Sequence, residues 1–114
     1  MRKVIGIPEF DHYFEELRRQ ALAGNGEAKY LTKIIDKGME KLRFDFRYGD
    51  HIARNKIPRE YFDKCQVNNL WKLNLDSNWR LIYTVRGTKD DVMSLLIEVL
   101  DHKTYCRKFG YNAG

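Results

Sequence analysis

Residues 69–85 constrain the fold most, because their pattern predicts two strands joined by a tight turn. Side chains alternate along a strand, and one face of each half is rich in aromatic and branched residues, which suit a half-buried sheet. These residues are Trp71, Leu73 and Leu75 before the turn, and Trp79, Leu81, Tyr83 and Val85 after it. The turn, Asp76-Ser77-Asn78, consists of short polar residues that bond back to the backbone. The segment therefore predicts a hairpin with one face in the core.

The opposite face of this hairpin places an arginine, Arg80, in mid-strand between apolar neighbours. Lys72 falls on the same face if the two strands pair in the register that this turn suggests. Two interpretations of Arg80 stay open at this point. It could form an ion pair with Glu98 of the last strand, or it could bind an anion that the protein recognises.

The length of 114 residues predicts a single domain over residues 1–114, built from strands and helices. A short strand over 2–7 ends at Pro8, and helical spacing of apolar residues follows over 9–23 and 27–47. Each helix has one apolar stripe, so the pair is expected to lie on a sheet. Gly38, in the middle of the second helix, suggests close packing on the first.

The region 49–69 looks irregular, apart from a short helix over 59–64 that Pro58 introduces. A last strand over 92–100 is nearly all apolar, which predicts a central position in the sheet. Simple alternation puts Ser94, Leu96 and Glu98 on one of its sides. Residues 101–111 are polar, basic and aromatic, and they are expected to form a short tail.

The charge balance indicates the kind of partner. A net charge of +5 and a pI near 9.2 favour an anionic partner, nucleic acid first, although a basic protein without one stays possible.

No apolar run approaches the roughly 20 residues of a membrane span, and the N-terminal apolar stretch is too short for a signal peptide. The two isolated cysteines, Cys65 and Cys106, give no disulfide or metal pattern, so a cytoplasmic location is expected.

Two motifs in the C-terminal half resemble the RelE/ParE toxin superfamily, in its RelE-like branch. They are Asn69-Leu-Trp-Lys-Leu73 with Trp79-Arg-Leu-Ile-Tyr83, and Asp101-His-Lys-Thr-Tyr105 directly after the last strand. The N-terminal half supports the resemblance through element order alone. The resemblance implies a RelE-like α+β fold, β-α-α-β-β-β, with two N-terminal helices on a small curved, mostly antiparallel sheet and a short C-terminal tail. It further implies the toxin of a type II toxin–antitoxin system that cleaves mRNA in the ribosomal A site and inhibits translation. A cognate antitoxin would neutralise it and set its oligomeric state.

Such cleavage, by attack of a 2′-hydroxyl on the adjacent phosphate, needs proton transfer and positive charge but no metal or cofactor. The planar guanidinium of Arg80 can donate two parallel hydrogen bonds to a phosphate, and the imidazole of His102 can act as a base or an acid. Tyr105 can donate a proton or stack on a base, and Lys103 can stabilise charge. The residues expected to bind RNA are Lys72, Arg107 and Lys108.

Each candidate also has a structural interpretation. His102 could cap the strand end or lie on the surface, Tyr105 and Tyr111 could cover the end of the sheet, and the basic side chains could simply be solvated. Two other functions stay open. ParE-like members share the fold, lack the ribonuclease residues and inhibit DNA gyrase, and a third class would bind RNA without chemistry. Convergence of His102, Lys103 and Tyr105 on Arg80 is a feature that a gyrase inhibitor does not need.

Overall fold

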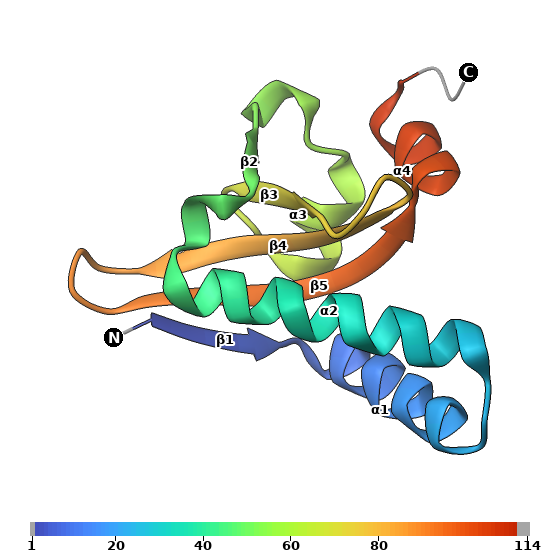
Figure 1. Ribbon diagram of the computed structural model, residues 1–114. Coiled ribbons are helices and arrows are strands. Elements are labelled where there is room, and N and C mark those ends of the chain that lie inside the picture. The colour runs from blue at the N-terminus through green and yellow to red at the C-terminus, as the bar shows by residue number, and fades with distance from the viewer. Residues whose placement is uncertain (1, 112–114) are drawn as a thin grey trace.

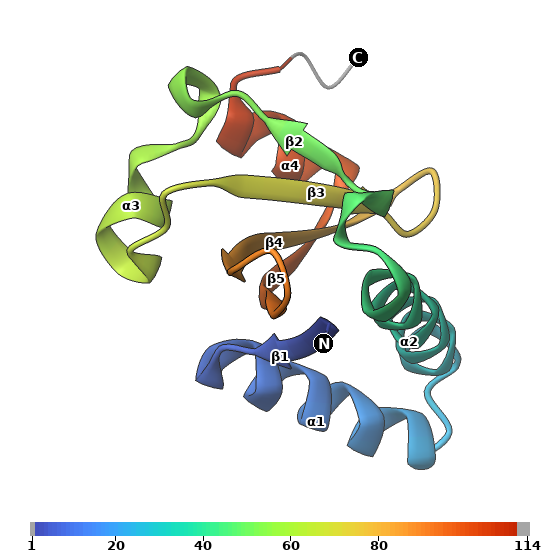
Figure 2. The same cartoon turned by 90° about the vertical axis from the view of Figure 1, so that its left-hand side faces the viewer.

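The computed structural model describes residues 2–111 and shows a five-stranded sheet with helices on both faces (Figures 1 and 2). In chain order the elements are β1 (Arg2–Gly6), α1 (Pro8–Leu22), α2 (Gly26–Phe44), η1 (Phe46–Tyr48), β2 (Asp50–Ile52), η2 (Arg54–Lys56), α3 (Arg59–Cys65), β3 (Leu70–Asn74), β4 (Trp79–Gly87), β5 (Val92–Asp101) and α4 (His102–Phe109). The strand order is β1-β5-β4-β3-β2, parallel between β1 and β5 and antiparallel elsewhere. The fold is therefore α+β with a mixed sheet. Within residues 2–111 no helix combines the length and the apolar character needed to cross a bilayer.

The hairpin predicted over 69–85 is confirmed as β3 and β4. Asn74 pairs with Arg80 and Lys72 pairs with Ile82, so Lys72 and Arg80 share a face as predicted. The side chain of Asp76 accepts hydrogen bonds from two backbone N–H groups of the turn, and the Tyr30 hydroxyl on α2 donates to its other oxygen. The tip of the hairpin is thus anchored to a helix.

Hydrogen bonds of Asn69 join the start of β3 to β4. Its side-chain amide donates to the Val85 carbonyl and accepts from the Val85 N–H, both at 2.9 Å, while its own carbonyl accepts from the Thr84 hydroxyl. Replacing Asn69 with alanine is expected to lower the free energy of unfolding by about 1–3 kcal/mol, because partly buried polar groups lose their partners. Urea unfolding would measure this, with the exposed Asn55→Ala as control. Equal midpoints for the two variants would contradict it.

The sheet carries a hydrophobic core on each face. The helices α1 and α2 cover one face, as predicted, over a core that includes Phe10, Leu31, Ile35, Leu42, Leu73, Leu81, Tyr83 and Leu96. The helices α3 and α4 cover the other face, over a core that includes Ile57, Tyr61, Leu70, Ile82, Ile97, Leu100, Tyr105 and Phe109. β5 lies between β1 and β4, so its predicted central position is confirmed. The short helix predicted over 59–64 is confirmed as α3, but the second core was not predicted, because the helix that completes it, α4, comes from a segment expected to be a tail.

The expected C-terminal tail is instead the helix α4. The Asp101 side chain accepts the Thr104 N–H at 2.7 Å as an N-cap, and Gly110, with φ of 77°, ends the helix in the left-handed region. The helix buries Tyr105 and Phe109 against the sheet. Sequence reasoning missed it because eight residues with one cap carry a weak periodic signal.

Three further details of the N-terminal half and of the middle differ from expectation. The segment Asp50–Ile52 is an edge strand, since backbone pairing with β3 needs little help from its polar side chains. Helix α2 ends at Phe44, because Asp45 is extended and its side chain caps the turn that follows. Gly38 packs on the sheet rather than on α1, since a Cβ there would lie 2.5 Å from Leu75.

A bulge breaks the alternation of β5. Ile82 pairs with Glu98, but the next residue, Tyr83, pairs with Leu96. β5 therefore has one extra residue here, and the side chains before it point to the opposite face from the one that simple alternation predicts. Leu96 joins the core under α1 and α2, whereas Ile97 joins the core on the other face. For this reason the prediction that Leu96 and Glu98 lie on one side of the strand was wrong.

Candidate functional site

Arg80 meets the first residue of α4 at one end of the sheet. The strands β4 and β5 are antiparallel neighbours, so the start of β4 lies beside the end of β5, where α4 begins. The Arg80 Nη2 atom lies 3.0 Å from Nδ1 of His102, and Nη1 donates to the Ser77 carbonyl at 3.3 Å. A guanidinium can only donate, so His102 Nδ1 accepts, and the neutral ring carries its proton on Nε2. Both side chains are half-buried.

The ring of Tyr105 lies close to two cations from the sheet. The Arg80 guanidinium carbon and the Lys72 ammonium nitrogen each lie 5.6 Å from its centroid. Both distances fall within the range of a cation–π interaction. Lys72 also pairs with Asp50 at 3.4 Å. Four of the predicted residues, from three elements, thus come together in one cluster.

Tyr105 itself is buried, with 5% of its surface exposed. Its ring stacks on Phe109 at 4.5 Å and on Tyr111 at 6.0 Å between centroids. Burial and then the neighbouring Tyr111 raise the pKa of Tyr105 to about 12, against the opposing effect of Arg80. The phenol therefore keeps its proton at neutral pH and can donate it but not accept one. The prediction that a base stacks on Tyr105 is wrong, because other rings cover it; Tyr111 is 44% exposed and offers a ring instead.

The basic residues of α4 divide between two sides of the helix. Lys103 and Arg107, one turn apart, are exposed. Lys108 instead pairs with Glu98 at 3.1 Å and Glu60 at 3.3 Å. Burial opposes the charged form, but these carboxylates outweigh it and raise the pKa of Lys108. Two carboxylates, from α3 and β5, thus hold Lys108 in this structure, and its binding to RNA stays a prediction.

The ion pair between Lys108 and Glu98 also bears on the interpretation in which Arg80 pairs with Glu98. Arg80 and Glu98 do lie on one face of the sheet, as the register requires. Glu98, however, accepts from Lys108 and from the Tyr61 hydroxyl, at 2.5 Å, while the Arg80 guanidinium binds His102 and Ser77. Of the two interpretations left open for Arg80, the ion pair with Glu98 is therefore wrong, and the Arg80 charge faces α4.

Sequence reasoning missed one neighbour of the site. The Cys106 sulfur lies 3.6 Å from Nε2 of His102. The signal was a spacing of four residues, which puts two side chains on one face only if the segment is helical. Without the helix α4, that spacing carried no information.

No protein-family model, curated protein or solved structure matches this chain. What the site can do follows from its own groups: a guanidinium with a planar fork, an imidazole, a phenol that keeps its proton, and an ammonium. Such a set suits proton transfer at a phosphate diester.

Asp101 fixes the start of α4 and thereby the position of His102. Hydrogen bonds from the side chain and backbone of Thr104 hold the pKa of Asp101 below its usual value. A depressed folded pKa means that this contribution to stability is present above the unfolded pKa of about 3.9 and is lost as the pH falls through the folded pKa. Asp101→Ala is expected to cost about 1 kcal/mol of unfolding free energy near neutral pH.

Urea unfolding of wild type and Asp101→Ala at a series of pH values would check this. The difference between the two proteins should shrink as the pH falls from about 5 to about 2. The exposed Asp63→Ala on α3 is the matched control. A difference that stays constant over this range would show that Asp101 acts through something other than its charge.

Proposed function

We propose that this protein is a RelE-like toxin of a type II toxin–antitoxin system and cleaves mRNA on the ribosome. One observation carries the proposal: the bond between Arg80 on β4 and His102 on α4, beside the ring of Tyr105. The motifs that resemble RelE-like toxins are the hairpin and the segment Asp101–Tyr105, and these are the segments that meet at the site. A purely structural arginine has no need of a titratable partner at this position.

The proposed reaction breaks one bond and forms one. The 2′-oxygen attacks phosphorus, the bond from phosphorus to the 5′-oxygen breaks, and a cyclic phosphate and a free 5′-hydroxyl result. Arg80 stabilises the negative charge on the non-bridging oxygens. A phosphate that takes the Nη2 donor of Arg80 releases Nδ1 of His102, which then accepts the 2′ proton. Tyr105 donates a proton to the 5′-oxygen.

The surrounding groups provide binding rather than chemistry. Lys72, Lys103 and Arg107 hold the phosphate backbone, and Tyr111 offers a face to an unstacked base. Lys56 lies 5.5 Å from the Tyr111 ring centroid and adds charge beside that base. The cognate antitoxin would be acidic and amphipathic, fold on binding and cover these cations.

Mapping of RNA ends in a cell-free translation reaction tests this function. Purified protein is added to a translated message, to the same message without ribosomes, and to supercoiled DNA with gyrase. The expected result is cleavage within translated codons that needs ribosomes, with gyrase unaffected. Inhibition of gyrase without cleavage would favour the ParE-like alternative, and ribosome binding without cut ends would favour a non-catalytic RNA-binding protein.

A further inference from the structure

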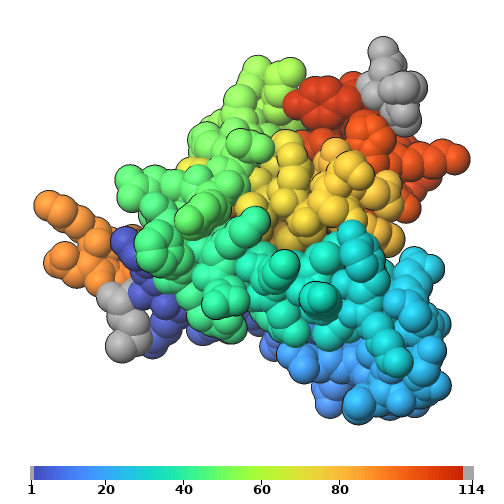
Figure 3. Space-filling view, in the orientation of Figure 1, coloured from blue at the N-terminus to red at the C-terminus, as the bar shows by residue number. Residues whose placement is uncertain are grey.

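A second basic surface lies at the other end of the sheet from Arg80. A hollow of about 470 Å³ is lined by Arg2, Arg43, Lys89, Asp90 and Val92. These residues come from the start of β1, the last turn of α2, the loop between β4 and β5, and the start of β5. In Figure 3 the green end of α2, the blue start of β1 and the orange β4–β5 loop lie near one another. The length of β4, roughly 25 Å, separates this surface from Arg80.

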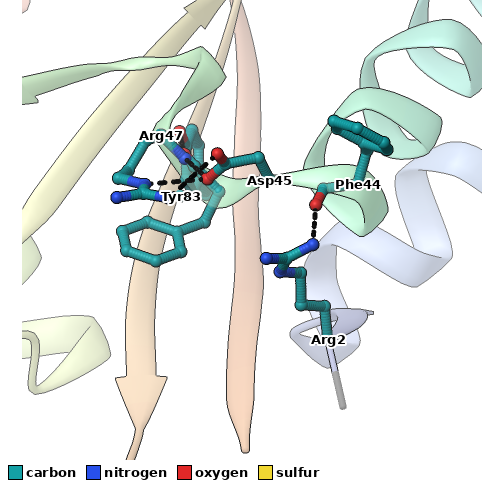
Figure 4. A network of polar contacts seen from close by, with 6 residues as sticks. Arg2, Phe44, Asp45, Arg47 and Tyr83 are labelled. Atoms are coloured by element: carbon teal, nitrogen blue, oxygen red, sulfur yellow. Dashed lines mark hydrogen bonds and ion pairs between the residues drawn. The ribbon is translucent and has the colours of Figure 1, made fainter. Parts of the chain in front are cut away.

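The hollow is positively charged. Arg2, Arg43 and Lys89 are all exposed, and Asp90 carries the one carboxylate among the described residues that line the hollow. The Asp45 carboxylate lies outside this lining but near enough to Arg2 for that charge to help lower the pKa of Asp45. Arg2 donates one guanidinium N–H to the carbonyl of Phe44, as Figure 4 shows, and a guanidinium has further donors for a ligand. Arg43 and Lys89 form no ion pair within residues 2–111. The helix dipole makes the C-terminal end of α2 partly negative, which explains one nearby cation but does not explain three cations around a hollow.

Two exposed aromatic rings come from the segment that directly follows Arg43 in the chain. Phe44 is 68% exposed and Tyr48 is 53% exposed, and their ring centroids lie 6.1 Å apart. Phe44 directly follows Arg43, and its carbonyl accepts from Arg2. Its ring points away from Arg2 (Figure 4), so the rings belong to the segment that carries these cations and do not line the hollow itself. Large aromatic side chains exposed beside cations point to a ligand that combines anionic groups with flat apolar ones.

We propose that this surface binds single-stranded nucleic acid, with phosphate at the cations around the hollow and bases on Phe44 and Tyr48. Basic groups that follow a backbone, with aromatic side chains for the bases, are the two components of such sites. A helical peptide would need an apolar groove, whereas Val92 is the one apolar side chain among the described residues that line the hollow. The inference goes beyond the proposed function, because neither its residues nor its test depends on cleavage.

Three double variants of the full chain test the proposal by fluorescence anisotropy with a labelled oligouridine of about 12 nucleotides. The first removes charge, Arg43→Gln with Lys89→Gln. The second removes rings, Phe44→Ser with Tyr48→Ser. The matched control, Lys29→Gln with Lys33→Gln, removes the same charge from exposed positions nearer the start of α2. Thermal unfolding verifies that each variant is folded.

The first variant is expected to weaken binding about tenfold and to lower the slope of log K against log salt by about 1.4, which corresponds to two phosphate contacts. The second is expected to weaken binding at least about fivefold and to leave the slope unchanged, since stacking involves no counterions. The control should stay within about twofold of wild type. The same pattern is expected in an Arg80→Ala background.

Equal losses in the first variant and the control would mean that binding follows net charge, and the proposal would fail. Wild-type affinity in both surface variants would also overturn it, and would leave a protein partner as the explanation of the exposed rings. If the variants bind oligouridine in the expected pattern but the wild type never cleaves messages, this inference holds and the proposed function fails.

Discussion

Replacement of Arg80 by alanine is expected to lower the rate of mRNA cleavage by at least about 100-fold, the usual effect of removing a group that stabilises transition-state charge. The same change should leave the protein folded. Arg80 is half-buried, and its Nε is a buried donor without a partner among the described residues, so truncation also removes a desolvation cost. Arg80→Lys is expected to fail nearly as badly, because a point charge cannot replace a planar fork.

Primer extension on messages translated with purified protein measures the cleavage rate, and induced expression measures growth arrest. Arg59→Ala is the matched control, because it removes an equal charge from a side chain on α3 that is 91% exposed. Thermal unfolding of both variants separates loss of chemistry from loss of fold. Growth arrest and cut ends that persist in folded Arg80→Ala would exclude Arg80 as the group that stabilises charge.

Tyr105→Ala is expected to lower the free energy of unfolding by about 3–5 kcal/mol, as the loss of a large buried aromatic side chain does. The ring stacks on Phe109 and is 5% exposed, so its removal leaves a cavity between α4 and the sheet. Because α4 also carries His102, loosening the helix should release His102 from Arg80. Urea unfolding measures the stability, and cleavage should be lost together with the fold of α4.

Tyr105→Phe separates the ring from the hydroxyl. The ring and its stacking are retained, so the free energy of unfolding should stay within about 1 kcal/mol of wild type. If the phenol protonates the leaving oxygen, cleavage should still fall about 100-fold, the typical contribution of a general acid. Full activity in Tyr105→Phe would exclude the hydroxyl and leave Tyr105 as a residue that positions Arg80 and Lys72 through its ring.

The sequence by itself determined those parts of the fold whose signal is local. Alternation over 69–85, helical spacing over 9–23 and an apolar run over 92–100 each report burial within one element. They predicted the hairpin, the first two helices and the central strand, and they put Lys72 and Arg80 on one face. The sequence also named Arg80, His102 and Tyr105 as candidates, through residue chemistry and a family resemblance.

Tertiary structure decided what those candidates touch. The antiparallel register of β4 and β5 brings Arg80 beside His102, and a bulge at Ile97 puts Leu96 on the opposite face of the sheet from Glu98. The Asp101 cap turns a supposed tail into a helix, and helical phase then directs Lys103 outward and Lys108 to the α3 side. Pairing partners and helical phase depend on segments far away in the chain, whereas periodicity depends on neighbours in sequence. For that reason the elements with a strong periodic signal could be predicted from the sequence, whereas the short strand β2, the helix α4 and the contacts of the site could not.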